Sequence, residues 1–217
     1  MLINEDTQEV AVDERKPKHP AGRRERNIEL KRQRILAAAS ELLQERGFAA
    51  VTTQAISDRA DVAAGTLFRY AASKSELLLM VYNEYLRDSI DDGARRAAAL
   101  VDPLDAVFAM VVPLLESAAQ WPENTAVYQR ELLFGPPHEQ YRGAGLALIA
   151  GLERAIALRL TAAKPDLVGD QARLAASSVF AVTHLAIART STGAHPKHVA
   201  AEDLRVQVAQ ILAGCGI

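Results

Sequence analysis

The chain has 217 residues, of which 49% are hydrophobic but only 5% aromatic, and 25 basic against 27 acidic residues leave a net charge of −2. This apolar content, dominated by Ala and Leu, favours helices over sheets. One cysteine, Cys215, excludes an internal disulfide and a cysteine cage around a metal. The polar N-terminus and the lack of a long apolar run predict a soluble, cytoplasmic protein without a membrane partner.

The N-terminal segment carries the strongest charge contrast. Residues 1–14 hold five acidic and no basic residues, whereas residues 15–34 hold nine basic and two acidic ones. Residues 1–25 contain two prolines and few apolar side chains, which predicts a disordered, charged arm. A basic run taken alone is as typical of a solvated tail as of a segment that neutralises DNA phosphates.

A first amphipathic helix is expected over residues 27–46. Apolar side chains recur at helical spacing from Ile28 to Leu43, and Gly47 stands where a helix C-cap belongs. Thr53 is a candidate N-cap for a short second helix that carries Ala55, Ile56 and Ala60.

A turn at Asp61-Val62 separates this helix from another short one, expected over residues 63–70. Ser73 and Glu76 then have the spacing of a capping box, which predicts a longer helix over residues 74–92.

The remainder of the chain shows helical patterns only. Asp102-Pro103 is a start signal, because a capping carboxylate precedes a proline at the first helical position, and Pro113 is expected to kink the helix that follows. Further helices are predicted over residues 123–134, 139–163, 170–190 and 201–213. The predicted fold class is all-α.

Two short helices with a tight turn, preceded by a longer helix and a basic segment, are typical of a helix-turn-helix DNA-binding unit. The turn needs a residue that tolerates left-handed backbone, followed by an apolar plug, here Val62. The recognition helix needs small and polar groups toward base edges and donors toward phosphates.

At these positions the sequence resembles the TetR family of bacterial one-component regulators. The stretches that carry the resemblance are 47–56, 61–70 and 73–78, and the order and spacing of some dozen positions fit together. The resemblance implies an arm over residues 1–25, a helix-turn-helix domain over 26–73 and a helical effector-binding and dimerisation domain over 74–217.

The resemblance also implies the DNA contacts. Hydroxyl and backbone N–H groups at the start of the second helix would hold a DNA phosphate. The first residues of the recognition helix would enter the major groove, and Tyr70 and Lys74 would contact the sugar-phosphate backbone of the DNA. The implied residues are Thr52, Thr53, Gln54, Ala63, Ala64, Gly65, Thr66, Arg69, Tyr70 and Lys74.

Three positions depart from the family pattern. Asp61 replaces the usual turn glycine, Phe68 replaces a common tyrosine, and Ala71 replaces a common phenylalanine. Asp tolerates left-handed backbone better than most residues, so the turn is expected to survive. Leu67 and Phe68 are expected to lie at least partly in the core.

For the C-terminal domain the resemblance implies a ligand pocket among the middle helices. We expect apolar and aromatic walls that suit a hydrophobic or amphipathic effector. The candidate lining residues, each of which is also a candidate for plain core packing, are Phe108, Val111, Val112, Leu115, Trp121, Tyr128, Phe134, Tyr141, Phe180 and His184.

The last two helices are expected to form a two-fold dimer. Their small and β-branched residues would allow close helix approach, although the same stripe is also suited to packing within one chain. The stripe comprises Ala172, Ala175, Ala176, Val179, Thr183, Ile187, Leu204, Val208, Ile211 and Leu212.

These features predict a homodimeric repressor that binds double-stranded DNA at a palindromic operator and is released by a small molecule. Alternatives are an activator, a regulator controlled by a protein partner, or a helical adaptor without DNA binding. No catalytic constellation and no nucleotide-binding glycine pattern are present, so no enzyme activity or cofactor is expected. His195 and His198 lack an obvious third ligand, so no metal site is expected either.

Overall fold

The computed structural model describes residues 21–167, 170–194 and 197–217, and these form nine helices and no strand. The all-α prediction is therefore confirmed. The helices are α1 (Ala21–Ala50), α2 (Thr53–Arg59), α3 (Ala64–Leu67), α4 (Lys74–Ala97), α5 (Pro103–Ala118), α6 (Pro122–Phe134), α7 (Gln140–Ala163), α8 (Gln171–Ser191) and α9 (Lys197–Gly214).

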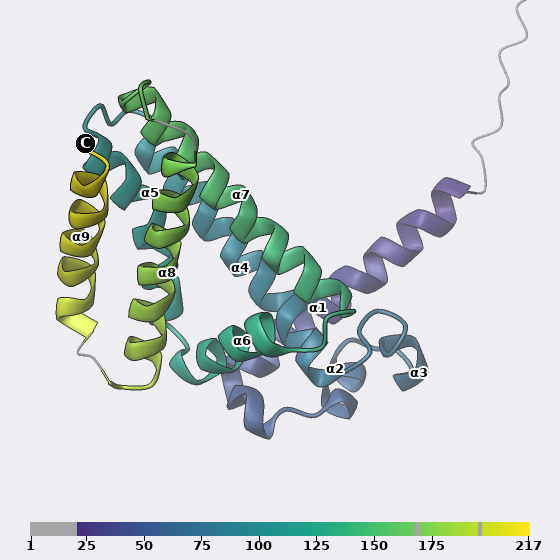
Figure 1. Ribbon diagram of the computed structural model, residues 1–217. Helices are drawn as coiled ribbons and strands as arrows, with labels where there is room; N and C mark the ends of the chain where they lie inside the picture. Colours follow the sequence, from purple (N-terminus) through teal and green to yellow (C-terminus); the bar gives the residue numbers. More distant parts are fainter. Residues whose placement is uncertain (1–20, 168–169, 195–196) are drawn as a thin grey trace, which may run out of the picture.

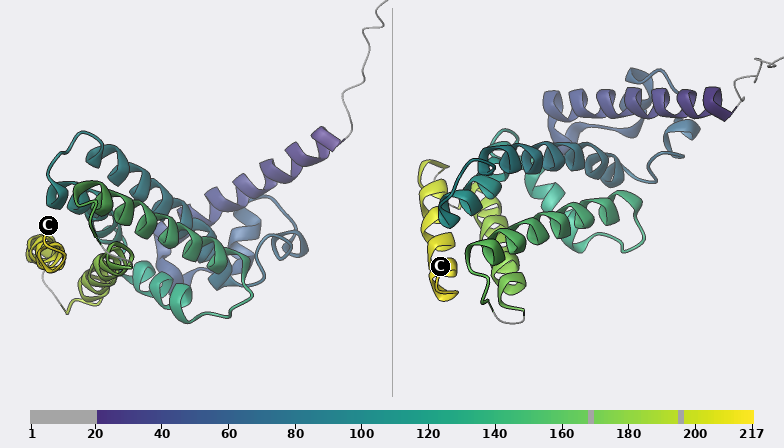
Figure 2. Two further views of the ribbon diagram at one scale, coloured as in Figure 1. Left: turned by 45° about the horizontal axis from the view of Figure 1, so that its top comes forward. Right: turned by 90° about the horizontal axis from the view of Figure 1, so that it is seen from above.

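The first helices and the last ones lie at opposite sides of the molecule (Figure 1). The N-terminal half of α1 projects outward as a rod, α2 packs against its other half, α3 lies near the projecting half, and α8 and α9 stand at the far side. Figure 2 shows the same separation from two further directions. The helix α4 lies between, so it connects the two sides.

Several predicted boundaries need correction. Helix α4 continues five residues beyond the expected end at residue 92, and α9 begins at Lys197 instead of residue 201. Helix α1 includes residues 21–25, which the sequence had placed in the disordered arm; residues 1–20 of that arm lie outside the described part of the chain. Arg and Glu are good helix formers, and extending an existing helix needs no new nucleus. Helix α3 is four residues long, not the expected eight, and is followed by turns up to Tyr70.

Helix ends follow the capping chemistry of the sequence. The side chain of Ser73 accepts a hydrogen bond from Glu76 N (3.0 Å), and that of Asp102 accepts one from Asp105 N (2.8 Å) ahead of Pro103. The capping box is incomplete, however, because the buried Glu76 carboxylate accepts instead from Tyr141 N at the start of α7 (3.1 Å). A tertiary contact thus replaces the local one. Helix α5 continues past Pro113 as a single helix.

Glycine allows α4 and α5 to approach closely. A Cβ at Gly93 would lie 2.5 Å from the carbonyl oxygen of Met110, closer than real Cβ contacts. Any side chain at this position would therefore push the two helices apart.

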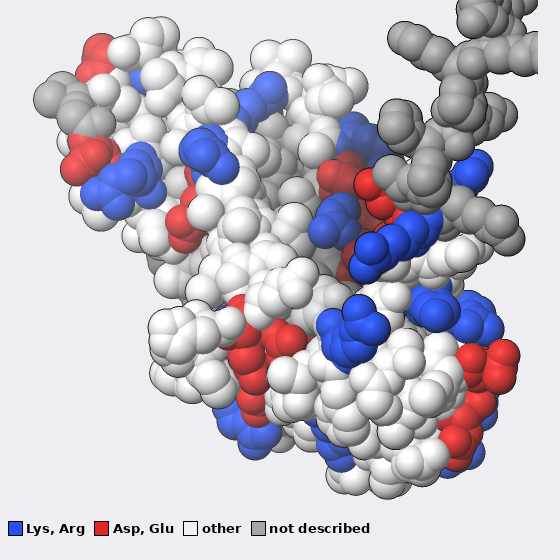
Figure 3. Space-filling view, turned by 90° about the vertical axis from the view of Figure 1, so that its right-hand side faces the viewer, with Lys and Arg blue, Asp and Glu red and all other residues white. Residues whose placement is uncertain are grey.

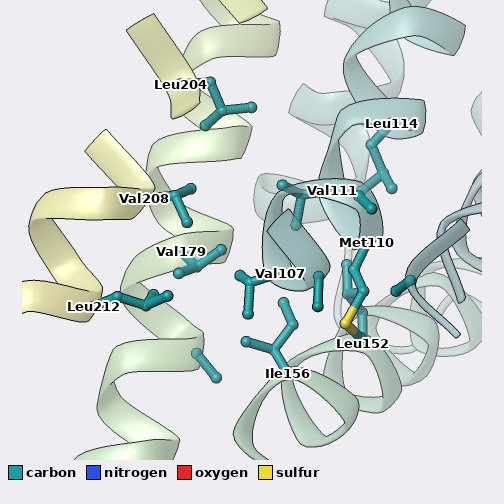
Figure 4. Packing of buried hydrophobic residues seen from close by; sticks show 14 of the residues in the cluster. Val107, Met110, Val111, Leu114, Leu152, Ile156, Val179, Leu204, Val208 and Leu212 are labelled. Carbon is teal, nitrogen blue, oxygen red and sulfur yellow. The ribbon is translucent and has the colours of Figure 1, made fainter. Parts of the chain in front are cut away.

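The buried side chains form two clusters. One unites α1, α2, α3 and the first half of α4 with parts of α6 and α7; the other fills the space between α5, α7, α8 and α9. In Figure 4 the side chains of Val107, Val179 and Ile156, from three different helices, point toward one another. Burial of these apolar faces stabilises the C-terminal domain.

Among the described residues, no single helix is long and apolar enough to cross a membrane. Helices α5 and α6 meet that test only as a pair, and they are bent by 117° at their junction.

Candidate DNA-binding unit and ligand cavity

Helix α2 begins with a side-chain cap. Thr52 has extended backbone, and its Oγ1 accepts a hydrogen bond from Ala55 N (3.1 Å). The predicted cap, Thr53, is instead the first helical residue. Either threonine has the chemistry of a cap, and the backbone conformation of Thr52 decides between them.

The turn between α2 and α3 adopts the predicted left-handed conformation. Asp61 has a φ of +50° and is the one non-glycine residue with positive φ in the described chain. Its carboxylate pairs with Arg34 of α1 (3.2 Å), and Val62 N donates to Ser57 O (3.0 Å). Aspartate thus takes the place of glycine here and also ties the turn to α1.

The front of α3 is open to solvent. Ala63 and Gly65 are exposed, Ala64 and Thr66 are half-buried, and Leu67 is fully buried beneath them. Phe68, which we expected to lie partly in the core, is 50% exposed. With only four helical residues, α3 turns one face toward the core, and Phe68 falls on the other.

A basic hollow lies between α3 and the projecting half of α1. It is lined by Arg24, Asn27, Ile28, Lys31, Thr66, Arg69 and Tyr70. Arg24, Lys31 and Arg69 form no ion pair with any other residue in the described segments. Figure 3 shows Lys and Arg side chains gathered on this side of the molecule. The hollow therefore offers unneutralised positive charge beside the exposed front of α3.

The hydroxyl of Tyr70 donates to the backbone oxygen of Ile28 (3.1 Å), which joins the end of the unit to α1. Thr53 is half-buried, whereas Thr52, Gln54 and Arg69 are exposed. Gln54 donates to Asp58 one turn further along α2 (2.7 Å).

Lys74 is placed differently from the other predicted contacts. Its ammonium group donates to the backbone oxygens of Phe48 (2.7 Å) and Val51 (2.9 Å) and lies 4.2 Å from the centre of the Phe48 ring. Phe48 belongs to the end of α1, where Gly47 breaks the helix with a φ of +73°, and Val51 directly follows that helix. Lys74 thus satisfies carbonyls that the break leaves without helical partners.

The main apolar cavity lies between α4, α5, α6, α7 and α8. Of the ten predicted pocket residues, Tyr128, Phe180 and His184 line it. Its other lining residues are Tyr82, Tyr85, Leu86, Ser89, Leu114, Ser117, Ala118, Thr125, Gln129, Leu132, Ile149 and Ile187.

The other seven predicted residues lie elsewhere. Val111 and Leu115 are core residues, Phe108 and Val112 are half-buried away from the cavity, and Phe134 is 82% exposed. Trp121 stacks on Tyr85 from outside (5.7 Å between centroids), and the half-buried Tyr141 packs against the N-terminal cluster. None of the residues predicted to line the pocket came from α4, which in fact contributes Tyr82, Tyr85, Leu86 and Ser89. These residues recur at helical spacing, and that spacing could have indicated that one face of α4 lines the cavity.

Two buried polar side chains, Gln129 and Tyr128, and the half-buried His184 line the cavity. Gln129 donates to His184 O (3.1 Å) and lies 3.1 Å from His184 Nδ1. Burial lowers the pKa of His184, so the neutral ring is favoured. The Tyr128 hydroxyl donates to Asn83 Oδ1 (2.9 Å), and burial raises the pKa of this tyrosine.

Two polar links connect the cavity region with α1. The Tyr85 hydroxyl lies 2.6 Å from Ser40 Oγ and accepts from Gln44 (2.7 Å). Asn124, one residue before the cavity-lining Thr125, donates to Leu43 O (2.8 Å) and accepts from Phe48 N (2.7 Å). Both links end on the α1 segment that supports α2 and α3.

The predicted dimer stripe lies inside the chain's own core. Ala172, Ala175, Ala176, Val179, Thr183 and Ile187 are all at most 9% exposed, and Leu204, Val208 and Leu212 are buried with them. Ile211 is half-buried against the same cluster. The alternative, packing within one chain, therefore holds for this stripe. Of the histidine segment near α9, residues 195–196 lie outside the described chain.

The arrangement of α1, α2 and α3, with its left-handed turn and exposed front, defines a helix-turn-helix unit of the class found in DNA-binding proteins. Residues 35–81 match the family model described as "Bacterial regulatory proteins, tetR family". The chain therefore carries, over these residues, the DNA-binding domain of this family.

Curated relatives match about half of the chain or less. The HTH-type transcriptional repressor KstR of Mycobacterium tuberculosis is 37% identical over 106 residues, which cover 48% of this chain and 47% of that protein. The HTH-type transcriptional activator FasR of Mycolicibacterium smegmatis is 36% identical over 90 residues, 40% of this chain and 41% of the relative. The matched part thus spans about half the length of these curated relatives or less.

The structural similarity extends over most of the chain. FadR of Thermus thermophilus, a TetR-family repressor solved in complex with lauroyl-CoA, superposes with a TM-score of 0.69 at 25% identity, covering 84% of this chain and 94% of FadR. The fold, including the helices that follow the helix-turn-helix unit, is therefore shared with this ligand-bound structure.

Proposed function

We propose that the protein is a homodimeric transcriptional repressor that binds a palindromic DNA operator and is released by a small hydrophobic or amphipathic ligand. The observation that carries this proposal is the exposed front of α3, residues 63–66, behind a left-handed turn at Asp61 and beside the basic hollow. Small side chains and one hydroxyl fit the major groove, and the basic side chains suit phosphates. The relatives include a repressor and an activator, and the proposal takes the repressor because KstR matches over the longer stretch.

The DNA contacts divide by their surroundings. Ala63, Ala64, Gly65 and Thr66 are proposed to face base edges, while Thr52, Thr53, Gln54, Arg69 and Tyr70 are proposed to contact phosphates. The Tyr70 hydroxyl would exchange its present acceptor, Ile28 O, for a phosphate oxygen. Lys74 is proposed to act mainly through the end of α1, because its ammonium already has backbone acceptors at 2.7 and 2.9 Å.

The proposed dimer interface is the outer face of α8 and α9. Leu174, Leu185 and Val206 are 54%, 46% and 53% exposed on these helices, and the intervening Ser178 and Ala181 are small and exposed. An exposed apolar helix face is typical of subunit contacts. A two-fold axis there would place two α3 helices on one side of the dimer.

Ligand control is proposed to act through the cavity. Its volume of about 70 Å³ is far below the ~300–1,000 Å³ of usual ligand pockets, so an effector must displace the surrounding helices. The Tyr85–Ser40 and Asn124–α1 links would pass a shift of α4 or α6 to the helix-turn-helix units, whose spacing must match successive major grooves.

Selection of bound duplexes from a random pool tests the proposal. We expect enrichment of a palindrome whose binding weakens steeply as salt rises, since phosphate contacts release counterions. A chain that enriches no sequence at low salt, with or without a ligand extract from its source cells, is not a DNA-binding repressor but a helical adaptor.

Variants then separate the proposed contacts. Thr66→Val is expected to change site preference, whereas Tyr70→Phe weakens binding to all duplexes alike.

Lys74→Met is expected to lower the melting temperature as well as DNA affinity, because it leaves the backbone oxygens of Phe48 and Val51 without this donor. Loss of affinity with an unchanged melting temperature would instead assign Lys74 to direct phosphate contact.

A further inference from the structure

The cavity interior is apolar and without formal charge. None of its fifteen lining residues is Asp, Glu, Lys or Arg, and the one histidine, His184, is already engaged with Gln129. A charged group placed inside would lose its hydration without gaining a counter-ion, which is strongly unfavourable. The cavity therefore favours a ligand whose buried part carries no charge.

A shallow groove adjoins the cavity where Tyr85, Ser89 and Ser117 line both. Its charged residues are three carboxylates and two guanidinium groups, from Asp88, Asp92, Glu116, Arg95 and Arg96. Arg96 pairs with Asp92 (2.7 Å) and Glu116 (3.0 Å), and Arg95 pairs with Asp92 (3.2 Å). Both cations are thus already neutralised, and the groove keeps one net negative charge.

We propose that the effector is an uncharged amphipathic molecule, with an apolar body in the cavity and one hydrogen-bonding group toward Gln129 and His184, and that anionic ligands such as fatty acids and acyl-CoA thioesters are rejected. This inference rests on the proposed ligand control. It sets the chain apart from the FadR of Thermus thermophilus, which was solved with lauroyl-CoA. An acyl-CoA would bring several phosphate charges to a groove that is itself negative.

Three probes of equal chain length test the ligand class: 1-decanol, decanoate and decanoyl-CoA, each below its micellar concentration. Trp121 is the single tryptophan of the chain and stacks on the cavity residue Tyr85, so its fluorescence reports occupancy. We expect saturable binding of decanol and a binding of decanoate and decanoyl-CoA that is weaker by about tenfold or more. Decanoyl-CoA binding as tightly as decanol, or no saturable decanol binding, overturns the proposal.

Two variants locate the effect. Ala118→Phe fills the cavity and is expected to abolish decanol binding. The double variant Asp92→Asn/Glu116→Gln releases Arg95 and Arg96 from their carboxylates and is expected to raise decanoyl-CoA affinity while decanol affinity is unchanged. Equal decanoyl-CoA affinity in wild type and double variant would show that groove charge does not select the ligand.

These measurements use the protein without DNA, so they are independent of operator binding. Saturable decanol binding that fails to release the selected duplex would count against ligand control, while the ligand class would stand.

Discussion

Around the helix-turn-helix unit, buried and half-buried polar side chains bind backbone groups at the ends of helices, whereas the core between α5, α7, α8 and α9 is built mainly from aliphatic side chains. Asn124, Glu76 and Lys74 each satisfy backbone groups of another element in the first region. The second region packs residues such as Val179, Ile156 and Leu204, each fully buried. Hydrogen bonds are directional and fix one geometry, while aliphatic packing supplies stability and tolerates change of shape.

The largest effect is expected in the aliphatic core. Ile156→Ala should lower the free energy of unfolding by about 2–5 kcal/mol, because it leaves a cavity at a fully buried site. Leu158→Ala on the same helix is the matched control, since Leu158 is 69% exposed and should change stability by less than about 0.5 kcal/mol. Urea unfolding followed by circular dichroism measures both. Similar losses for the two variants would contradict the description of this core.

A smaller loss is expected at the polar link from α6 to α1. Asn124→Ala leaves the buried Leu43 O and the half-buried Phe48 N without their partner, at a cost of about 1–3 kcal/mol. The same variant should also weaken the effect of a bound ligand on DNA affinity, which a change in general stability alone would not do. The exposed neighbour Arg130→Ala serves as control. Unaltered ligand response in Asn124→Ala would exclude this link as a route of coupling.

The cap of α2 gives a third, smaller difference. Thr52→Ala should destabilise the protein by about 1 kcal/mol, because its Oγ1 no longer accepts from Ala55 N. Thr53→Ala removes no cap and should have the lesser effect on thermal unfolding. A larger destabilisation by Thr53→Ala than by Thr52→Ala would show that Thr53 is the N-cap of α2, as the sequence pattern alone predicts.

The smallest effect concerns pH. Because burial lowers the pKa of His184, the unfolded chain takes up a proton before the folded one as pH falls below about 6.5. Stability is therefore complete above that pH and decreases below it, down to the folded pKa. His184→Gln should flatten this part of the stability–pH curve, while His138→Gln, an exposed histidine, should not. Identical curves for the wild type and His184→Gln would contradict the assignment.

The sequence by itself determined the helix-turn-helix unit and the helical class, because both depend on contacts between near neighbours. The cap at Ser73, the Asp102-Pro103 start and the left-handed Asp61 turn are set by the chemistry of a few adjacent residues. The short length of α3 was not predicted, since tertiary contacts decide where a weak helix ends.

Only the tertiary structure decided which apolar faces meet. The small residues of α8 pack against their own chain, and the cavity takes Tyr82 and Tyr85 from α4 in place of Val111 and Leu115. Glu76 and Lys74 likewise serve partners 65 and 23–26 residues away, which spacing within one helix cannot reveal. Helical periodicity shows that a face is buried, but the partner of that face follows from how all the helices fill space together.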